Sequence, residues 1–106
     1  MWYAVSILSR GEPQGLDSQE GIWEESIVLI RAEDEIKAAT AAADLAHEPF
    51  SYKSRGGGEI RWSFDSVNCV CAIDAEHLMH GVELFSRFLR PVEVASLKRP
   101  FSDEEY

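Results

Sequence analysis

The sequence predicts an α+β fold, a two-layer sandwich in which a mainly antiparallel β-sheet carries one helix on one face. Three observations predict it. Several segments alternate apolar and polar residues or are rich in aromatic and β-branched residues, as strands are. One segment has apolar residues at helical spacing. The elements follow the order β-β-α-β-β-β, and a chain of 106 residues is long enough for one core only. Residues 1–106 are therefore expected to form a single domain.

The first two strands are expected at residues 2–9 and 22–31. Residues 2–9 alternate and contain several aromatic and branched side chains. The connecting residues 10–21 contain glycines, a proline and scattered acids, which indicates a long loop. Residues 22–31 contain the apolar run SIVLI. Such a run is typical of a strand buried on both faces, so we expect this strand at the centre of the sheet.

The helix is expected over residues 32–47. Acids crowd its first turn, where negative charge suits the helix dipole, and Asp34 is the expected N-cap. Pro49 prevents the helix from continuing. The stripe expected to face the sheet is Ile36, Ala39, Ala43 and Ala46. Its alanines are small enough to let the helix lie close to the sheet.

Two further strands are expected at residues 50–54 and 59–73. The three glycines at 56–58 predict a hairpin turn between them. A phosphate-binding loop is the alternative for such glycines, but that loop opens a helix and a strand follows here. A change of face within residues 59–73 predicts a β-bulge near Asp65.

The last strand is expected at residues 81–90, where Pro91 ends it. The core would then span about residues 2–91. Residues 92–106 are charged and are expected to form an extended or frayed tail.

The chain is acidic, with 19 acidic and 10 basic residues and a net charge of −9. This charge argues against binding nucleic acid or an anionic membrane, because both would repel the protein. Residues 11–35 carry −7, whereas residues 87–99 carry +3. The acidic segment is either a solubilising face or a surface that attracts a basic partner. Its candidate residues are Glu12, Asp17, Glu20, Glu33, Asp34 and Glu35.

No apolar run approaches the ~18 residues that span a bilayer, and the start MWYAVSILSRG lacks the basic leader of a signal peptide. We therefore expect a cytoplasmic protein. Cys69 and Cys71 lie two positions apart in an expected strand, about 6.6 Å between Cα atoms, near or beyond the disulfide limit. Reduced, half-buried thiols are expected.

The adjacent carboxylates Glu24 and Glu25 are the first candidate for chemistry. Successive side chains of a strand point to opposite faces, so these two cannot form a catalytic dyad. They are either strand charges paired with a neighbouring arginine, or one of them lies in a pocket on the open face of the sheet. The candidate interaction or pocket residues are Trp23, Glu24, Glu25, Trp62, Phe85 and Arg87.

The residue types that bind metals occur together only as Cys69, Cys71, His77 and His80. A Cys-x-Cys pair on a strand is expected to spread its sulfurs too far to share one zinc ion comfortably. The serines and histidines follow no nucleophile pattern, and no nucleotide-binding motif is present. We therefore expect no metal, no cofactor and no catalytic residue.

A helix of alanines is expected to cover only one face of the sheet, and aromatic residues come from four of the expected strands. These aromatic residues are Trp2, Tyr3, Trp23, Trp62, Phe64, Phe85 and Phe88. The open face is either covered by the long loop and the tail or left exposed. A large exposed apolar face on a soluble protein marks an interaction site. Homodimerisation through this face, or capture of a partner there, is therefore expected.

Three motifs in the order W-Y-A-V (residues 2–5), W-E-E-S (23–26) and S-R-F-L (86–89) resemble an uncharacterised family of small bacterial proteins, a domain of unknown function. The resemblance implies a bacterial, cytoplasmic origin and a compact single domain, but no activity. Small acidic bacterial domains include immunity proteins that neutralise toxins, by analogy of class. If W-E-E-S and S-R-F-L lie in adjacent strands, Glu24 or Glu25 is expected to meet Arg87.

Together these features predict a small acidic, non-enzymatic protein-interaction domain. Its most concrete form is an immunity-type protein that neutralises a basic toxin, and a homodimer is expected. The alternative is a ligand-binding or enzymatic domain with an open-face pocket that contains Trp23, Trp62, one of the two glutamates and Arg87. A third possibility is a purely structural homodimer subunit.

Overall fold

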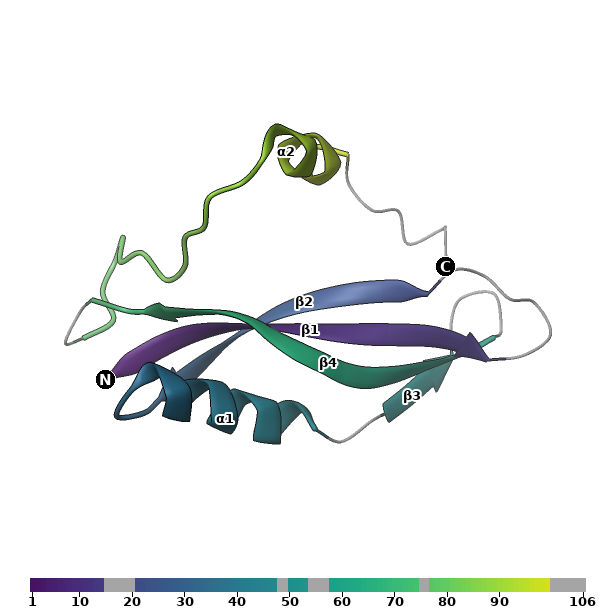
Figure 1. Cartoon of the computed structure of the whole chain (residues 1–106), viewed down its shortest axis with the longest axis horizontal. Coiled ribbons are helices and arrows are strands. Elements are labelled where there is room, and N and C mark those ends of the chain that lie inside the picture. The colour runs from purple at the N-terminus through teal and green to yellow at the C-terminus, as the bar shows by residue number, and fades with distance from the viewer. Residues whose placement is uncertain (15–20, 48–49, 54–57, 75–76, 100–106) are drawn as a thin grey trace.

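The computed structural model describes residues 1–14, 21–47, 50–53, 58–74 and 77–99, and Figure 1 shows their arrangement. The elements in chain order are β1 (Trp2–Gln14), β2 (Ile22–Arg31), α1 (Glu35–Ala46), β3 (Phe50–Lys53), β4 (Glu59–Ala72) and α2 (Pro91–Leu97). The strands form one antiparallel sheet of order β2-β1-β4-β3. The predicted α+β class is confirmed, and the number and order of its strands differ from the prediction.

The core lies between α1 and the face of the sheet that α1 covers (Figure 1). Alternate residues of β1 point to that face, and Tyr3, Val5 and Ile7 are all buried there. Ala38 and Ala42 of α1 are fully buried against them. One turn of a helix separates these two alanines, and their small side chains let the helix approach the strands closely.

Asp34 caps α1 as predicted, because its carboxylate accepts a hydrogen bond from the backbone N–H of Lys37 at 2.8 Å. The predicted stripe is right only in part. Ala46 packs against the core, but Ile36 is 79% exposed, and the alanines buried against the sheet are Ala38 and Ala42. Helical spacing fits more than one stripe of an alanine-rich helix, and the connection from β2 decides which stripe faces inward.

The position of β2 in the sheet also differs from the prediction. Its residue range agrees, but β2 is an edge strand, and β1 occupies a central position. The apolar run is buried on the α1 side only. Ile30 is buried there, whereas Ile27 and Leu29 point to the other face and are about half exposed. An apolar run therefore does not distinguish a central strand from an edge strand whose open face remains apolar.

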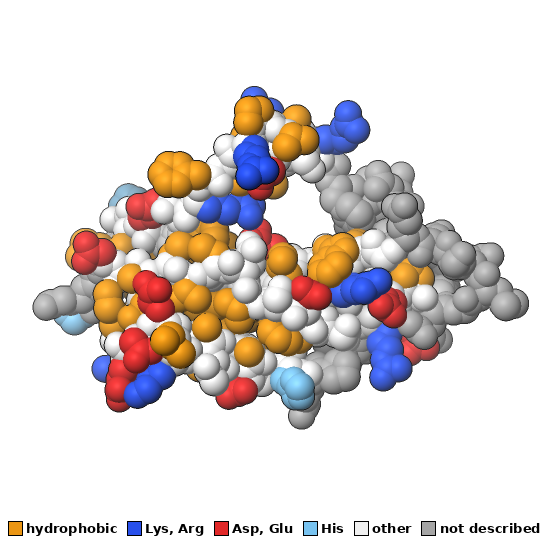
Figure 2. Space-filling model, in the orientation of Figure 1, with side chains coloured by type: hydrophobic (Ala, Val, Ile, Leu, Met, Phe, Trp, Pro, Cys, Tyr) orange, Lys and Arg blue, Asp and Glu red, His pale blue; other side chains and the backbone are white. Residues whose placement is uncertain are grey.

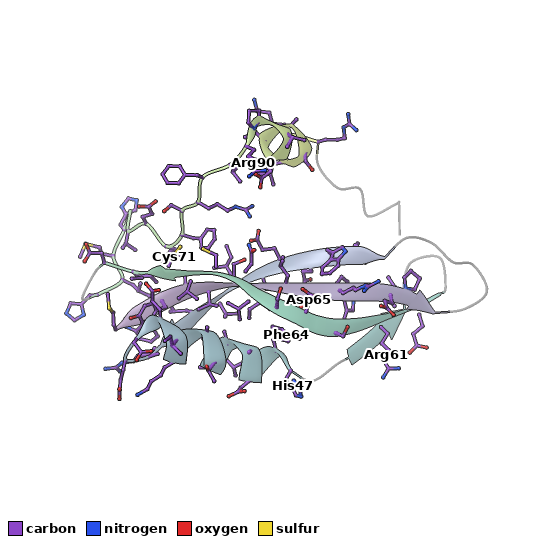
Figure 3. All side chains as sticks on the ribbon, in the orientation of Figure 1. His47, Arg61, Phe64, Asp65, Cys71 and Arg90 are labelled. Atoms are coloured by element: carbon purple, nitrogen blue, oxygen red, sulfur yellow. The ribbon has the colours of Figure 1, made fainter. Side chains whose placement is uncertain are left out.

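β4 contains the predicted bulge and a second one. Leu8 and Ser9 of β1 pair with Ser66 and Phe64, so Asp65 is the extra residue. A similar shift between Ser6 and Ile7 leaves Asn68 unpaired in register. Figure 3 shows Phe64 on the side of β4 that faces α1.

β1 is longer than predicted and continues to Gln14, so the expected loop begins later. Residues 15–20 of that loop and residues 54–57 of the expected hairpin turn lie outside the described residues. The hairpin itself is present in the pairing of β3 with β4, where Lys53 lies opposite Glu59.

The predicted last strand is wrong. Residues 82–90 have no regular secondary structure and join neither edge of the sheet. A strand requires a neighbour with which to exchange hydrogen bonds, and the alternation of these residues does not supply one. Pro91 begins α2 where it was expected to end a strand, since proline suits the first helical position. Residues 92–97, expected in an extended or frayed tail, are therefore helical.

Candidate functional site

The face of the sheet opposite α1, called here the open face, carries an exposed apolar patch. Strand pairing places Arg10 opposite Trp23, Ser6 opposite Ile27 and Ala4 opposite Leu29 on this face. Trp23, Ile27 and Leu29 are 51%, 50% and 45% exposed. These three side chains of edge strand β2 are called the β2 patch.

Arginines accompany the tryptophans of the open face. The guanidinium of Arg10 lies over the ring of Trp23, 5.8 Å from its centroid, and that of Arg31 lies over Trp2 at the same distance. Both are pairs of directly opposite residues on β1 and β2. Cation–π contacts of this kind fix the tryptophan rings in place. Trp23 remains half exposed beside its arginine.

Glu25 is the polar centre of the open face. Its Oε2 accepts a hydrogen bond from the Ser6 hydroxyl at 2.6 Å and one from Arg87 Nη1 at 3.4 Å. The hypothesis that a glutamate of W-E-E-S meets Arg87 is thus confirmed for Glu25, although residue 87 is not in a strand. Glu24 points to the other side and accepts from Ser26 Oγ at 3.1 Å. The two carboxylates are separated, as strand geometry requires.

The segment from Val82 to Arg87 crosses the open face beside β4. Cys71 Sγ lies 3.5 Å from the carbonyl oxygen of Ser86, where it donates a hydrogen bond. A shallow cleft of about 200 Å³ lies between this segment and the end of β4. Its lining is Cys71, Ala72, Asp74, Val82, Glu83, Leu84, Phe85 and Ser86. Pockets that hold small organic ligands are usually larger, about 300–1,000 Å³.

Cys69 and Cys71 both point to the open face and are free thiols. Their sulfurs lie 3.7 Å apart, closer than the spacing of strand positions predicts. Burial raises the pKa of the Cys69 thiol above its ordinary value, and the hydrogen bond and charge of Cys71 raise this pKa further. Within the described part of the chain no three Cys, His, Asp or Glu side chains form a metal-binding cluster. His77 and His80 are exposed.

Residues 87–97, called here the arm, lead away from the open face to α2 (Figure 1). Among the described helices and strands, α2 contacts none. Figure 2 shows an opening between α2 and the sheet, and apolar side chains on α2. Phe88 is fully exposed, and Val92 and Leu97 are 73% and 60% exposed. Beyond Arg87, which binds Glu25, the arm therefore carries exposed apolar side chains, and its helix packs on no described helix or strand.

The predicted interaction or pocket residues divide between the two faces. Trp23, Glu25 and Arg87 lie on the open face, and Phe85 lines the nearby cleft. Trp62 does not join them. It is 4% exposed and lies opposite Gly11 on the face that carries α1. The structure therefore does not form one pocket from Trp23, Trp62, a glutamate and Arg87.

The predicted acidic surface is dispersed as well. Glu12 lies 3.3 Å from Arg10 at the far end of β1. Glu33 pairs with Lys37 at 2.6 Å, and Asp34 caps α1. Glu35 lies in the first turn of α1. Asp17 and Glu20 lie outside the described residues.

The arm is not among the predicted elements, although the sequence contains a start signal for α2. Pro91 occupies the first helical turn, and Glu93 accepts a hydrogen bond from the backbone N–H of Arg90 at 3.0 Å. An R-P-V-E segment with this spacing is a helix start. The alternation of residues 81–90 predicted a strand, and Pro91 was therefore interpreted as its end and not as a helix start.

Comparison with protein families identifies the chain. The model of the family described as Domain of unknown function (DUF4288) matches residues 2–86. The chain belongs to the DUF4288 family. The match includes all four strands, α1 and the segment over the open face, and it ends next to Arg87, the first residue of the arm. Comparison with curated proteins and with solved structures gave no match. In the described part of this DUF4288 protein, no helix has the length and apolar character that crossing a membrane requires.

Proposed function

We propose that this DUF4288 protein is a non-enzymatic interaction domain that binds another protein chain through the β2 patch and the arm. The observation that carries the proposal is that the chain has two exposed apolar surfaces, the β2 patch and the arm. Both lie at or next to the open face. Burying Trp23, Ile27 and Leu29 against a partner would contribute about 25 cal/mol for each Å² of apolar surface removed from water.

The chemistry of the open face supports binding over catalysis. Glu25 is engaged by Ser6 and Arg87, and it fastens the base of the arm to the sheet. Glu25 therefore has a positioning role. The cleft beside Phe85 is small and lies apart from Trp23. A pocket-based activity that uses Trp23, Trp62 and Arg87 has no support, because Trp62 is buried on the other face.

The finer form of the proposal is an immunity-type role, in which the acidic chain neutralises a basic toxin. The net charge of −9 supports it, since long-range attraction accelerates the encounter of oppositely charged proteins. A gene for a large toxin-like protein directly upstream would favour this form. Capture of the toxin would weaken at high salt, because salt screens the attraction.

An affinity experiment tests the proposal. Immobilised wild-type protein and the variants Ile27→Lys and Ile36→Lys are offered a lysate of the source cells and an untagged copy of the chain. Ile36 is the matched control, because it is an exposed isoleucine on α1, away from the open face. We expect wild type and Ile36→Lys to capture the same proteins and Ile27→Lys to lose them. Equal capture by all three would contradict the proposal.

A further inference from the structure

The apolar side chains of the arm are not buried against the described part of their own chain. α2 has only seven residues, and helices shorter than about 12–15 residues are marginal in water unless they pack against something. Among the described residues no helix or strand contacts α2. Phe88 next to it is fully exposed. A stable α2 therefore requires a surface that the described part of one chain does not supply.

The same chain carries a surface of the right kind. The β2 patch is apolar and half exposed, and it lies on the face above which the arm projects (Figure 1). The arm carries exposed apolar side chains of its own, those of Phe88, Val92 and Leu97. One chain thus has two exposed apolar surfaces, and each is of the kind that would cover the other.

Only the base of the arm touches β2 of its own chain, where Arg87 binds Glu25, and α2 contacts no described strand. Ser86 and Arg87 are fastened over Cys71 and Glu25, and the chain leaves the sheet from there (Figure 3). A helix that projects from the body in this way is an element that two copies of a chain can exchange, as in domain swapping.

We infer that two copies of this chain exchange arms. The α2 helix of each copy enters the opening between the partner's arm and sheet, and Phe88, Val92 and Leu97 pack on the partner's β2 patch. A two-fold axis makes the two contacts identical, so the β2 patch and the apolar side chains of the arm are buried in both copies. This inference rests on the proposed function, because it names the occupant of the same surface.

The test uses two variants with opposite charges. The arm variant Phe88→Asp/Val92→Asp replaces two exposed apolar side chains by carboxylates, and only Val92 lies in α2, in the first turn where aspartate is favourable. The face variant Ile27→Lys/Leu29→Lys places positive charge where the arm would pack. All four replaced side chains are exposed in a single chain, so both variants should fold, and circular dichroism checks this. Ile36→Lys is the control for the face variant.

Light scattering gives the mass in solution. We expect wild type and Ile36→Lys to have the mass of two chains and each variant alone the mass of one. An equimolar mixture of the two variants should regain the mass of two, because one exchanged contact is native and the other joins aspartates to lysines. A wild type with the mass of one chain would overturn the inference. Variants that each remain dimeric alone would also overturn it, because they would show a dimer that forms elsewhere, such as through the edge of β2. A mixture of the two variants that stays monomeric would overturn it as well.

The two proposals fail in different ways. A monomeric wild type whose captured proteins are lost by Ile27→Lys overturns the arm exchange and leaves the proposed function standing. A monomeric wild type whose captured proteins are unaffected by Ile27→Lys overturns both.

Discussion

At the scale of single residues, Glu25 and Gly11 each have a specific role on one face of the sheet. Glu25 joins Ser6 of β1 to Arg87 of the arm, although 62 positions separate Glu25 from Arg87 in the chain. Gly11 lies under Trp62 on the other face, where the backbone and the indole ring are in close contact. One residue fixes where the arm starts, and the other allows the largest side chain to be buried.

Replacing Gly11 by alanine should destabilise the fold. A Cβ atom there would lie 2.8 Å from Ile22 Cγ2 and 3.0 Å from Trp62 Cη2, closer than carbon atoms pack. We expect Gly11→Ala to lower the free energy of unfolding by about 1–3 kcal/mol, as overpacking does. Urea denaturation measures it. Ser63→Ala, at an exposed position on β4, is the control and should change stability by less than about 0.5 kcal/mol. An equal effect of both variants would contradict this close packing.

The Cys69 thiol should react slowly near neutral pH. Its pKa is raised by burial and by Cys71, so the folded protein holds the thiol proton to a higher pH than the unfolded chain does. Stability should then decline as the pH rises above the ordinary thiol value, because the unfolded state releases the proton first. Alkylation of a Cys71→Ser variant, followed by mass spectrometry, checks Cys69 alone, although this variant removes one cause of the shift. Equal rates in buffer and in urea at pH 8 would contradict a protected thiol.

At the scale of elements, α1 depends on alanines that leave no room for larger side chains. Ala38 and Ala42 are fully buried against β1 and β4. They hold the helix close to the sheet, and this contact forms the core of the molecule.

Enlarging the buried stripe of α1 should therefore cost stability, and trimming the exposed stripe should not. We expect Ala42→Leu to lower the free energy of unfolding by about 1–3 kcal/mol. Ile36→Ala should change it by less than about 0.5 kcal/mol, because Ile36 is 79% exposed. Thermal and urea unfolding measure both. A larger loss of unfolding free energy for Ile36→Ala than for Ala42→Leu would contradict the observed orientation of α1 and favour the predicted stripe.

The elements also show what a single sequence can predict. The range of β2, the cap at Asp34 and the bulge at Asp65 follow from local patterns, and all three are confirmed. The edge position of β2 and the missing last strand depend on which strands pair, which alternation alone does not encode. The contact of Glu25 with Arg87 was predicted from two motifs. The exposure of Phe88 was not, because it depends on where the arm points.

At the scale of the whole molecule, the two faces of the sheet differ in how they are covered. α1 packs on one face and forms the core with it. On the second side the segment from Val82 to Arg87 covers part of β4, and the β2 patch stays exposed below a helix that packs on nothing described (Figure 2). The arm starts at Arg87, which binds Glu25 of edge strand β2, and α2 then lies away from the sheet without covering the β2 patch (Figure 1).

An isotope-filtered NOE experiment on mixed labelled and unlabelled chains tests the arm exchange most directly. It detects only protons of different chains that lie close together, and it requires no assumption about the register of the contact. The exchange predicts intermolecular NOEs between the methyl groups of Ile27 and Leu29 in one copy and Phe88, Val92 and Leu97 in the other. The absence of intermolecular NOEs from the β2 patch, with NOEs from α1 or with none at all, would contradict it.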